Sequence, residues 1–91
     1  MKTEEYIIII LTVMEEQGVV SIEYASNSHE GNVTANIKDS QGRTVHHFSG
    51  LAQTDKGRLT ASSDGWLPGT YVCTIEVEGI VKDSKNFAVR G

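Results

Sequence analysis

Apolar and polar residues alternate along much of the chain with the period of two that is typical of half-buried β-strands. The alternation is clearest at residues 33–38 and 71–77, where every second side chain is apolar. No segment shows a sustained helical period. The pattern predicts an all-β sandwich of about seven antiparallel strands that forms a single domain. Strands with weaker patterns are expected at residues 20–24, 43–49, 58–62 and 81–89.

The stretch from Tyr6 to Met14 is apolar but lacks alternation. Its β-branched residues favour a strand. Such a strand is expected to be buried on both faces or covered by a partner, because an uncovered apolar edge promotes aggregation. A second copy of the chain is the candidate cover, so this strand predicts a homodimer interface. The run is too short for a membrane span, which needs about 20 apolar residues.

Turn residues separate the predicted strands. Gly18 can take the positive φ that closes a hairpin, and Glu78 with Gly79 is a two-residue hairpin signal. Asp39 with Gly42 is typical of an Asx turn followed by a left-handed residue. Pro68 and Gly69 form a corner before the most regular strand. The side chains of Tyr71 and Cys73 are expected to enter the core from that strand, so replacing Gly69 or Tyr71 should lower stability.

Composition and charge exclude several classes of protein. The net charge is −4, and the eight basic residues are scattered along the 91-residue chain, which argues against a nucleic-acid partner. The single cysteine, Cys73, cannot form an internal disulfide. It lies on the apolar face of its predicted strand and is therefore interpreted as a small buried hydrophobic residue.

Three histidines are the first residues to consider as metal ligands. His29, His46 and His47 could combine with Asp55 or Glu30, but adjacent strand residues point to opposite faces, so His46 and His47 cannot share one ion without a bulge. No nucleophile motif surrounds the serines. We therefore expect no metal site, no cofactor and no catalytic residue, and the protein is not expected to be an enzyme.

Trp66 has the best claim to a role at the surface. A large aromatic side chain in a loop with Asp64 and Gly65 can anchor a partner, or it can cap the open end of the sandwich. The cap is the favoured interpretation, and the partner contact remains the alternative.

The spacing of Tyr71 and Cys73 resembles the tyrosine corner of immunoglobulin (Ig) domains, in which a tyrosine lies two residues before a core cysteine. There is no second cysteine, so a disulfide-bonded Ig domain is excluded. The resemblance implies an Ig-like β-sandwich.

Three further segments resemble the small Ig-like modules of secreted Bacteroidetes proteins, particularly the C-terminal sorting domain of the type IX secretion system. Residues 33–45 are similar to its strand-turn-strand, and residues 67–72 to its Leu-Pro-x-Gly-x-Tyr corner, one residue shorter. Residues 79–90 are similar to its closing hairpin, with Lys85, Phe87, Val89 and Arg90 in the expected order. Sorting domains open with an aromatic-Pro-Asn-Pro segment, whereas this chain has one proline and opens with the isoleucine-rich strand.

This resemblance implies a non-catalytic module of an exported bacterial protein that serves in sorting, anchoring or structure. Secretion machinery would then recognise the final strand, including Lys85 and Arg90. The departure at the opening favours the related stand-alone exported Ig-like proteins. Under that alternative the chain is a periplasmic or surface binding or adhesion protein that uses the loops at residues 26–32 or 63–68. Both readings imply a protein partner and a secreted, surface or periplasmic location, with a targeting segment outside this sequence.

Overall fold

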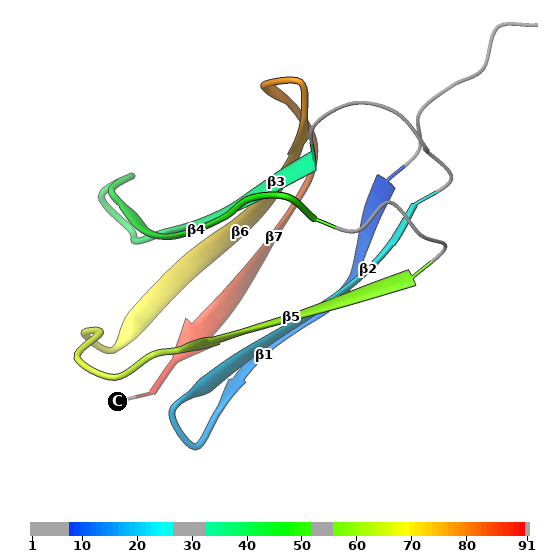
Figure 1. The fold of residues 1–91 in the computed structure, drawn as a ribbon. Helices are drawn as coiled ribbons and strands as arrows, with labels where there is room; N and C mark the ends of the chain where they lie inside the picture. The colour runs from blue at the N-terminus through cyan, green and yellow to red at the C-terminus, as the bar shows by residue number, and fades with distance from the viewer. Residues whose placement is uncertain (1–7, 27–32, 52–55, 91) are drawn as a thin grey trace, which may run out of the picture.

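The protein folds into strands and turns, and a computed structural model describes residues 8–26, 33–51 and 56–90. No helix occurs within these ranges. Figure 1 shows the strands as two layers. Over the described residues the strands are β1 (Ile8–Glu16), β2 (Val19–Ser26), β3 (Val33–Lys38), β4 (Thr44–Phe48), β5 (Lys56–Ser62), β6 (Gly69–Val77) and β7 (Ile80–Val89).

The strands form two antiparallel sheets. One sheet has the order β1-β2-β5 and the other β4-β3-β6-β7. The chain therefore crosses from one sheet to the other after β2, after β4 and again after β5. This is the arrangement of an Ig-like sandwich, and it confirms the fold class predicted from the sequence.

The core lies between the two sheets. Strand β3 shows why the alternation works, because Val33, Ala35 and Ile37 are buried while the residues between them stay half-exposed. Strand β6 buries Tyr71 and Cys73 as predicted. Each large aliphatic side chain removed from water stabilises the fold by about 1.5–3 kcal/mol. The other buried apolar side chains are those of Ile8, Ile10, Val20, Ile22, Tyr24, Leu51, Ala61, Ile75, Val77, Phe87 and Val89.

Strand β1 differs from its prediction. The register of β1 against β2 shifts between Ile10 and Thr12, which inserts Leu11 as a β-bulge. Ile8 and Ile10 are buried before the bulge, whereas Ile9, Leu11 and Met14 are 44%, 40% and 52% exposed. The expectation of burial on both faces within the chain is therefore wrong. The run lacks sequence alternation because its outward positions are also apolar and the bulge moves the pattern by one residue. Tyr6 lies outside the described residues.

The two tightest hairpins use glycine as predicted. Gln17 and Gly18 have φ values of 53° and 81°, and Glu78 and Gly79 have values of 52° and 82°. Two consecutive positive φ values are those of a type I′ turn, whose twist matches that of the strands it joins.

The turn between β3 and β4 is organised by Asp39. Its Oδ1 accepts the backbone N–H groups of Gln41 and Arg43, each at 2.9 Å, and Gly42 takes a φ of 84°. The N–H of Arg43 contributes most to a lowered pKa of the Asp39 carboxyl. The predicted Asx turn is thus confirmed.

The corner before β6 contains the hydrogen bond that defines a tyrosine corner. The hydroxyl of Tyr71 donates a hydrogen bond of 2.6 Å to the backbone oxygen of Leu67. Trp66 stacks on the Tyr71 ring with a centroid distance of 5.4 Å and an interplanar angle of 22°. The hydroxyl ties the loop to the strand, so the corner is held by both a hydrogen bond and aromatic packing.

Candidate binding groove between the first and last strands

Strands β1 and β7 lie side by side but belong to different sheets, and each has one hydrogen-bonded neighbour strand. Two carboxylates bridge them in place of a backbone ladder. Asp83 Oδ2 accepts the N–H of Ile10 at 2.8 Å, and Glu15 Oε1 accepts the N–H of Arg90 at 3.4 Å. Residue numbers rise along both strands from the first contact to the second, so the two strands run parallel.

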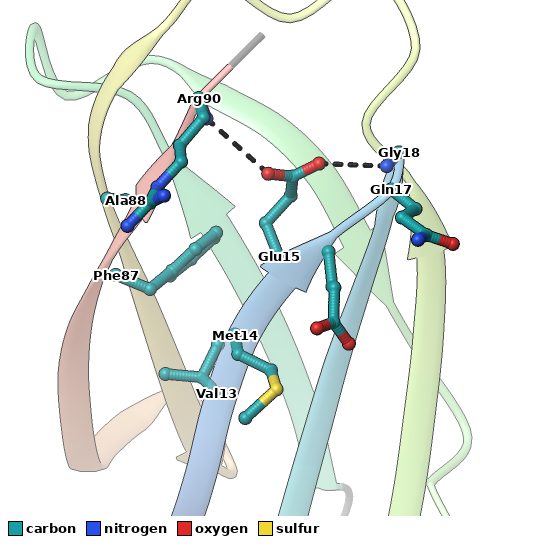
Figure 2. A pocket seen from close by; sticks show the side chains of 9 residues that line it. Val13, Met14, Glu15, Gln17, Gly18, Phe87, Ala88 and Arg90 are labelled. Atoms are coloured by element: carbon teal, nitrogen blue, oxygen red, sulfur yellow. Dashed lines mark hydrogen bonds between the residues drawn. The ribbon is translucent and has the colours of Figure 1, made fainter.

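A groove opens between β1 and β7 near the Glu15 bridge (Figure 2). Its volume is about 570 Å³. Val13 and the buried Phe87 supply apolar walls, and Met14 is more exposed. Glu15 and Arg90 supply opposite charges. The groove therefore combines apolar contacts, a cation and two strand edges.

Glu15 ties three segments of the chain together. Its Oε2 accepts the N–H of Gly18 at 2.9 Å, and its Oε1 accepts the N–H of Arg90 (Figure 2). Oε2 also accepts the hydroxyl of Ser63 at 3.1 Å. The Gly18 hydrogen bond, more than the bonds from Arg90 and Ser63, lowers the pKa of the Glu15 carboxyl below its ordinary value of 4.5. The groove wall is thus held in place by a carboxyl group whose ionised form these hydrogen bonds favour.

Replacing Glu15 with glutamine is expected to lower the thermal midpoint at pH 7. A carboxyl with a lowered folded-state pKa stabilises the fold fully above its unfolded pKa, and this stabilisation is lost as the pH falls through the folded pKa. The difference between the wild type and Glu15→Gln should therefore shrink as the pH falls below 4.5. Thermal melts monitored by circular dichroism across this range test the prediction.

Glu16→Gln is the matched control, since Glu16 is the next residue along and its side chain is exposed. It is expected to leave the midpoint unchanged. A Glu15→Gln difference that stays constant with pH would contradict the role given to the Glu15 carboxylate.

The predicted contact residues lie in two places. Arg90 lines the groove, and its side chain runs past Ala88 in Figure 2. Lys85 is exposed on β7, further from the Glu15 bridge. Trp66 is outside the groove lining, half-buried and packed against the core. The structure thus places Lys85 on the edge strand β7, Arg90 directly after that strand, and Trp66 in the loop between β5 and β6.

Sequence reasoning missed Glu15 and Asp83. Glu15 directly follows the apolar run that ends at Met14, and no pattern in the sequence marks it for a role. Every second residue from Asp83 to Val89 points to the same side of β7. On that side Phe87 and Val89 are buried, whereas the two positions before them, Asp83 and Lys85, are charged. Charged residues at inward positions are typical of edge strands that must avoid pairing with other chains. The charged residues in the apolar alternation of this strand were therefore the signal by which Asp83 could have been found.

The candidate metal ligands do not converge among the described residues. His46 faces the core side, where its ring lies 4.5 Å from that of Phe48. His47 points to the outer face, as strand geometry predicted, and contacts Asn36. No group of three potential ligands occurs in the part of the chain that the structure describes. His29, Glu30 and Asp55 lie outside that part.

Cys73 is fully buried, and this burial, together with the nearby Asp83 charge, raises the pKa of its thiol to about 12. Relative to the ordinary value of 9.0, that rise lowers the thiolate fraction at neutral pH about a thousandfold. The folded protein is therefore expected to resist a thiol-specific reagent such as DTNB, while the same protein in denaturant reacts at once. Rapid labelling of the folded protein would contradict the burial of Cys73.

In the described residues no helix is long and apolar enough to cross a membrane.

Comparisons with known proteins concern the fold. No protein-family model and no curated protein matches this chain. It is similar to a solved Pseudomonas fluorescens alkylpurine DNA glycosylase AlkC, bound to DNA containing an abasic site analog, at 18% identity and a TM-score of 0.60. That match covers 96% of this chain and 31% of the glycosylase, so the chain spans less than a third of that protein. The apo β-glucuronidase from Ruminococcus gnavus matches at 16% identity and a TM-score of 0.43, over 94% of this chain and 15% of that one. The glycosylase match supports the two-sheet fold alone.

Proposed function

We propose that this chain is a non-catalytic Ig-like module of an exported bacterial protein, and that it serves in sorting or anchoring by binding a protein partner along β1 and β7. The observation that carries this proposal is the groove between two strand edges that no backbone ladder joins. The resemblance of residues 33–45, 67–72 and 79–90 to secreted Bacteroidetes modules supports the exported setting.

The groove suits an extended segment of a partner. An extended peptide adds to an exposed strand edge through main-chain hydrogen bonds, and neighbouring pockets select its side chains. Val13 and Phe87 would receive an apolar side chain. Arg90 has no ion pair with another described residue, so its guanidinium can attract an acidic group of the partner.

Charge reversal on β7 and at Arg90, the residue that follows it, tests this function. Lys85→Glu combined with Arg90→Glu, introduced into the full-length protein in the bacterium that carries its gene, is expected to reduce the secreted or surface-bound fraction severalfold. The readout is quantitative immunoblotting of cell fractions. Because exposed charges contribute little to stability, the variant should retain its thermal midpoint.

Lys56→Glu with Arg58→Glu on β5 is the matched control, because β5 is the far edge strand of the other sheet. It makes the same change in net charge and should leave the distribution unchanged. An unaltered distribution of the β7 variant would overturn the proposed role of β7.

A second candidate function, a stand-alone periplasmic or surface binding protein, is favoured by the loop between β5 and β6. Leu67 is 74% exposed at its tip, beside the half-buried Trp66. Under this function, surface adhesion should fall in Leu67→Ser and be retained in the β7 charge-reversal variant. The reverse pattern would favour sorting.

A homodimer through β1 is part of the proposal. Ile9, Leu11 and Met14 supply exposed apolar surface on this strand, and a second copy would remove it from water. Sedimentation velocity at high concentration should then show a dimer that Met14→Lys abolishes. A monomer at all concentrations would contradict the dimer, but it would not count against the proposed binding of a partner in the groove.

A further inference from the structure

A row of polar side chains crosses the outer face of the four-stranded sheet, apart from the groove. His47 of β4 pairs with Asn36 of β3, Asn36 with Thr74 of β6, and Thr74 with Ser84 of β7. We name these four residues the polar row. Their chain neighbours Ile37, Cys73 and Ile75 are buried in the core, so the row faces outward. Figure 1 shows the sheet that carries it.

Hydrogen bonds fix the orientation of the Asn36 amide and the position of the ring proton of His47. Glu76 Oε2 accepts from Asn36 Nδ2 at 2.7 Å, and a carboxylate oxygen only accepts, so the amide nitrogen of Asn36 must face Glu76. Asn36 Oδ1 then faces His47 Nδ1 at 2.6 Å. A carbonyl oxygen cannot donate, so His47 Nδ1 must carry the proton. In neutral His47 the Nε2 atom is therefore a hydrogen-bond acceptor that faces away from the Asn36 contact.

Thr74 is unusual among the described outward residues. It is 9% exposed, and its Oγ1 is buried without a hydrogen-bond partner in the part of the chain that the structure describes. A buried hydroxyl that lacks a partner costs free energy, which a hydrogen bond from a ligand would recover. Glu76 lies two residues further along β6 on the same face. Thr74 and Glu76 are thus neighbouring polar residues on the outward face of β6.

We propose that Thr74 and Glu76 bind a guanidinium group and that His47 Nε2 accepts a second donor of the same ligand. A guanidinium is planar, has five donors and no acceptor, and pairs well with a carboxylate. His47 is two strands from β6, which corresponds to about 10 Å, so one guanidinium cannot reach both ends of the row. The ligand therefore needs a further N–H donor, as an arginine within a peptide or free arginine has.

The charged residues beside Thr74 favour the binding of a cation rather than an anion near Glu76. Glu76 lies on one side of the Asn36–Thr74 pair, and Lys38 lies on the other side, opposite Val72. A cation is therefore drawn toward Glu76 and away from Lys38. An anionic ligand would meet a carboxylate and the acceptor atom of His47.

Solution NMR tests the proposal without knowledge of the natural ligand. Nitrogen-15 spectra of the histidine rings should show His47 as the Nδ1–H tautomer. Ethylguanidinium should shift the Thr74 and Glu76 resonances to saturation, while ethylammonium at equal concentration should leave them unshifted. An Nε2–H tautomer, or an equal response to the two cations, would overturn the proposal.

Single substitutions test the roles of Thr74 and Glu76, and a comparison of two arginine ligands tests the source of the guanidinium. Thr74→Val keeps the shape of the side chain and should weaken ethylguanidinium binding about tenfold, as should Glu76→Gln. Lys38→Gln is the matched control and should not weaken it. Equal affinity of Thr74→Val and wild type would contradict the role of the hydroxyl. Tighter binding of a blocked Gly-Arg-Gly tripeptide than of free L-arginine would assign the site to a protein ligand, and the reverse order to free arginine.

Discussion

Replacing Tyr71 with alanine is expected to lower the free energy of unfolding by about 3–5 kcal/mol, the range for deleting a large buried aromatic side chain. The Tyr71 ring is 5% exposed. It lies between Trp66 and Phe87, with centroid distances of 5.4 and 6.0 Å. Alanine would leave a cavity between these rings and would remove the donor that the Leu67 oxygen accepts. Urea denaturation followed by circular dichroism measures the loss.

Tyr71→Phe separates the two contributions, because it keeps the ring and removes only the hydroxyl. Loss of that hydrogen bond should cost about 1 kcal/mol. A Tyr71→Ala variant within 1 kcal/mol of the wild type would show that the corner does not organise this end of the sandwich, since about 3 kcal/mol is the least that such a deletion costs.

Replacing Gly57 with valine is expected to destabilise the protein by about 2–3 kcal/mol through overpacking. Glycine weakens most strands, so the same change at an ordinary strand position would be neutral or stabilising. Here Tyr24 lies directly opposite Gly57 in the β2–β5 pairing, and a Cβ atom at Gly57 would collide with the Tyr24 ring. The ring is 1% exposed and packed in the core, so it cannot move aside freely.

Thr60→Val is the control on the same strand, at an exposed position where valine meets no buried ring. It should change stability by less than about 0.5 kcal/mol. A Tyr24→Leu background should reduce the cost of Gly57→Val, because the shorter side chain leaves room for the added atoms. A Gly57→Val variant as stable as the wild type would contradict the close packing of Tyr24 over Gly57.

The candidate groove shows what could not be predicted from the chain. The resemblance points to Lys85 and Arg90, and the structure places Lys85 on β7 and Arg90 directly after it. The two bridging carboxylates were not selected, because Asp83 contacts Ile10 across 73 residues and Glu15 contacts Arg90 across 75. No local pattern of apolar and polar residues specifies which acid reaches which backbone group so far away.

By itself, the sequence determined the all-β class, the strands at Val33–Lys38 and around Tyr71, and the turns at Gly18, Asp39 and Gly79. These features follow from side-chain alternation and from backbone preferences, which act over a few residues. The tertiary structure alone decided three others: the bulge at Leu11, the seating of Tyr24 over Gly57, and the carboxylate bridges between β1 and β7. The bulge depends on the register of β1 against β2, the Tyr24 contact on the pairing of β2 with β5, and the bridges on the packing of one sheet against the other. The order of apolar and polar residues within one strand specifies none of these relations between strands.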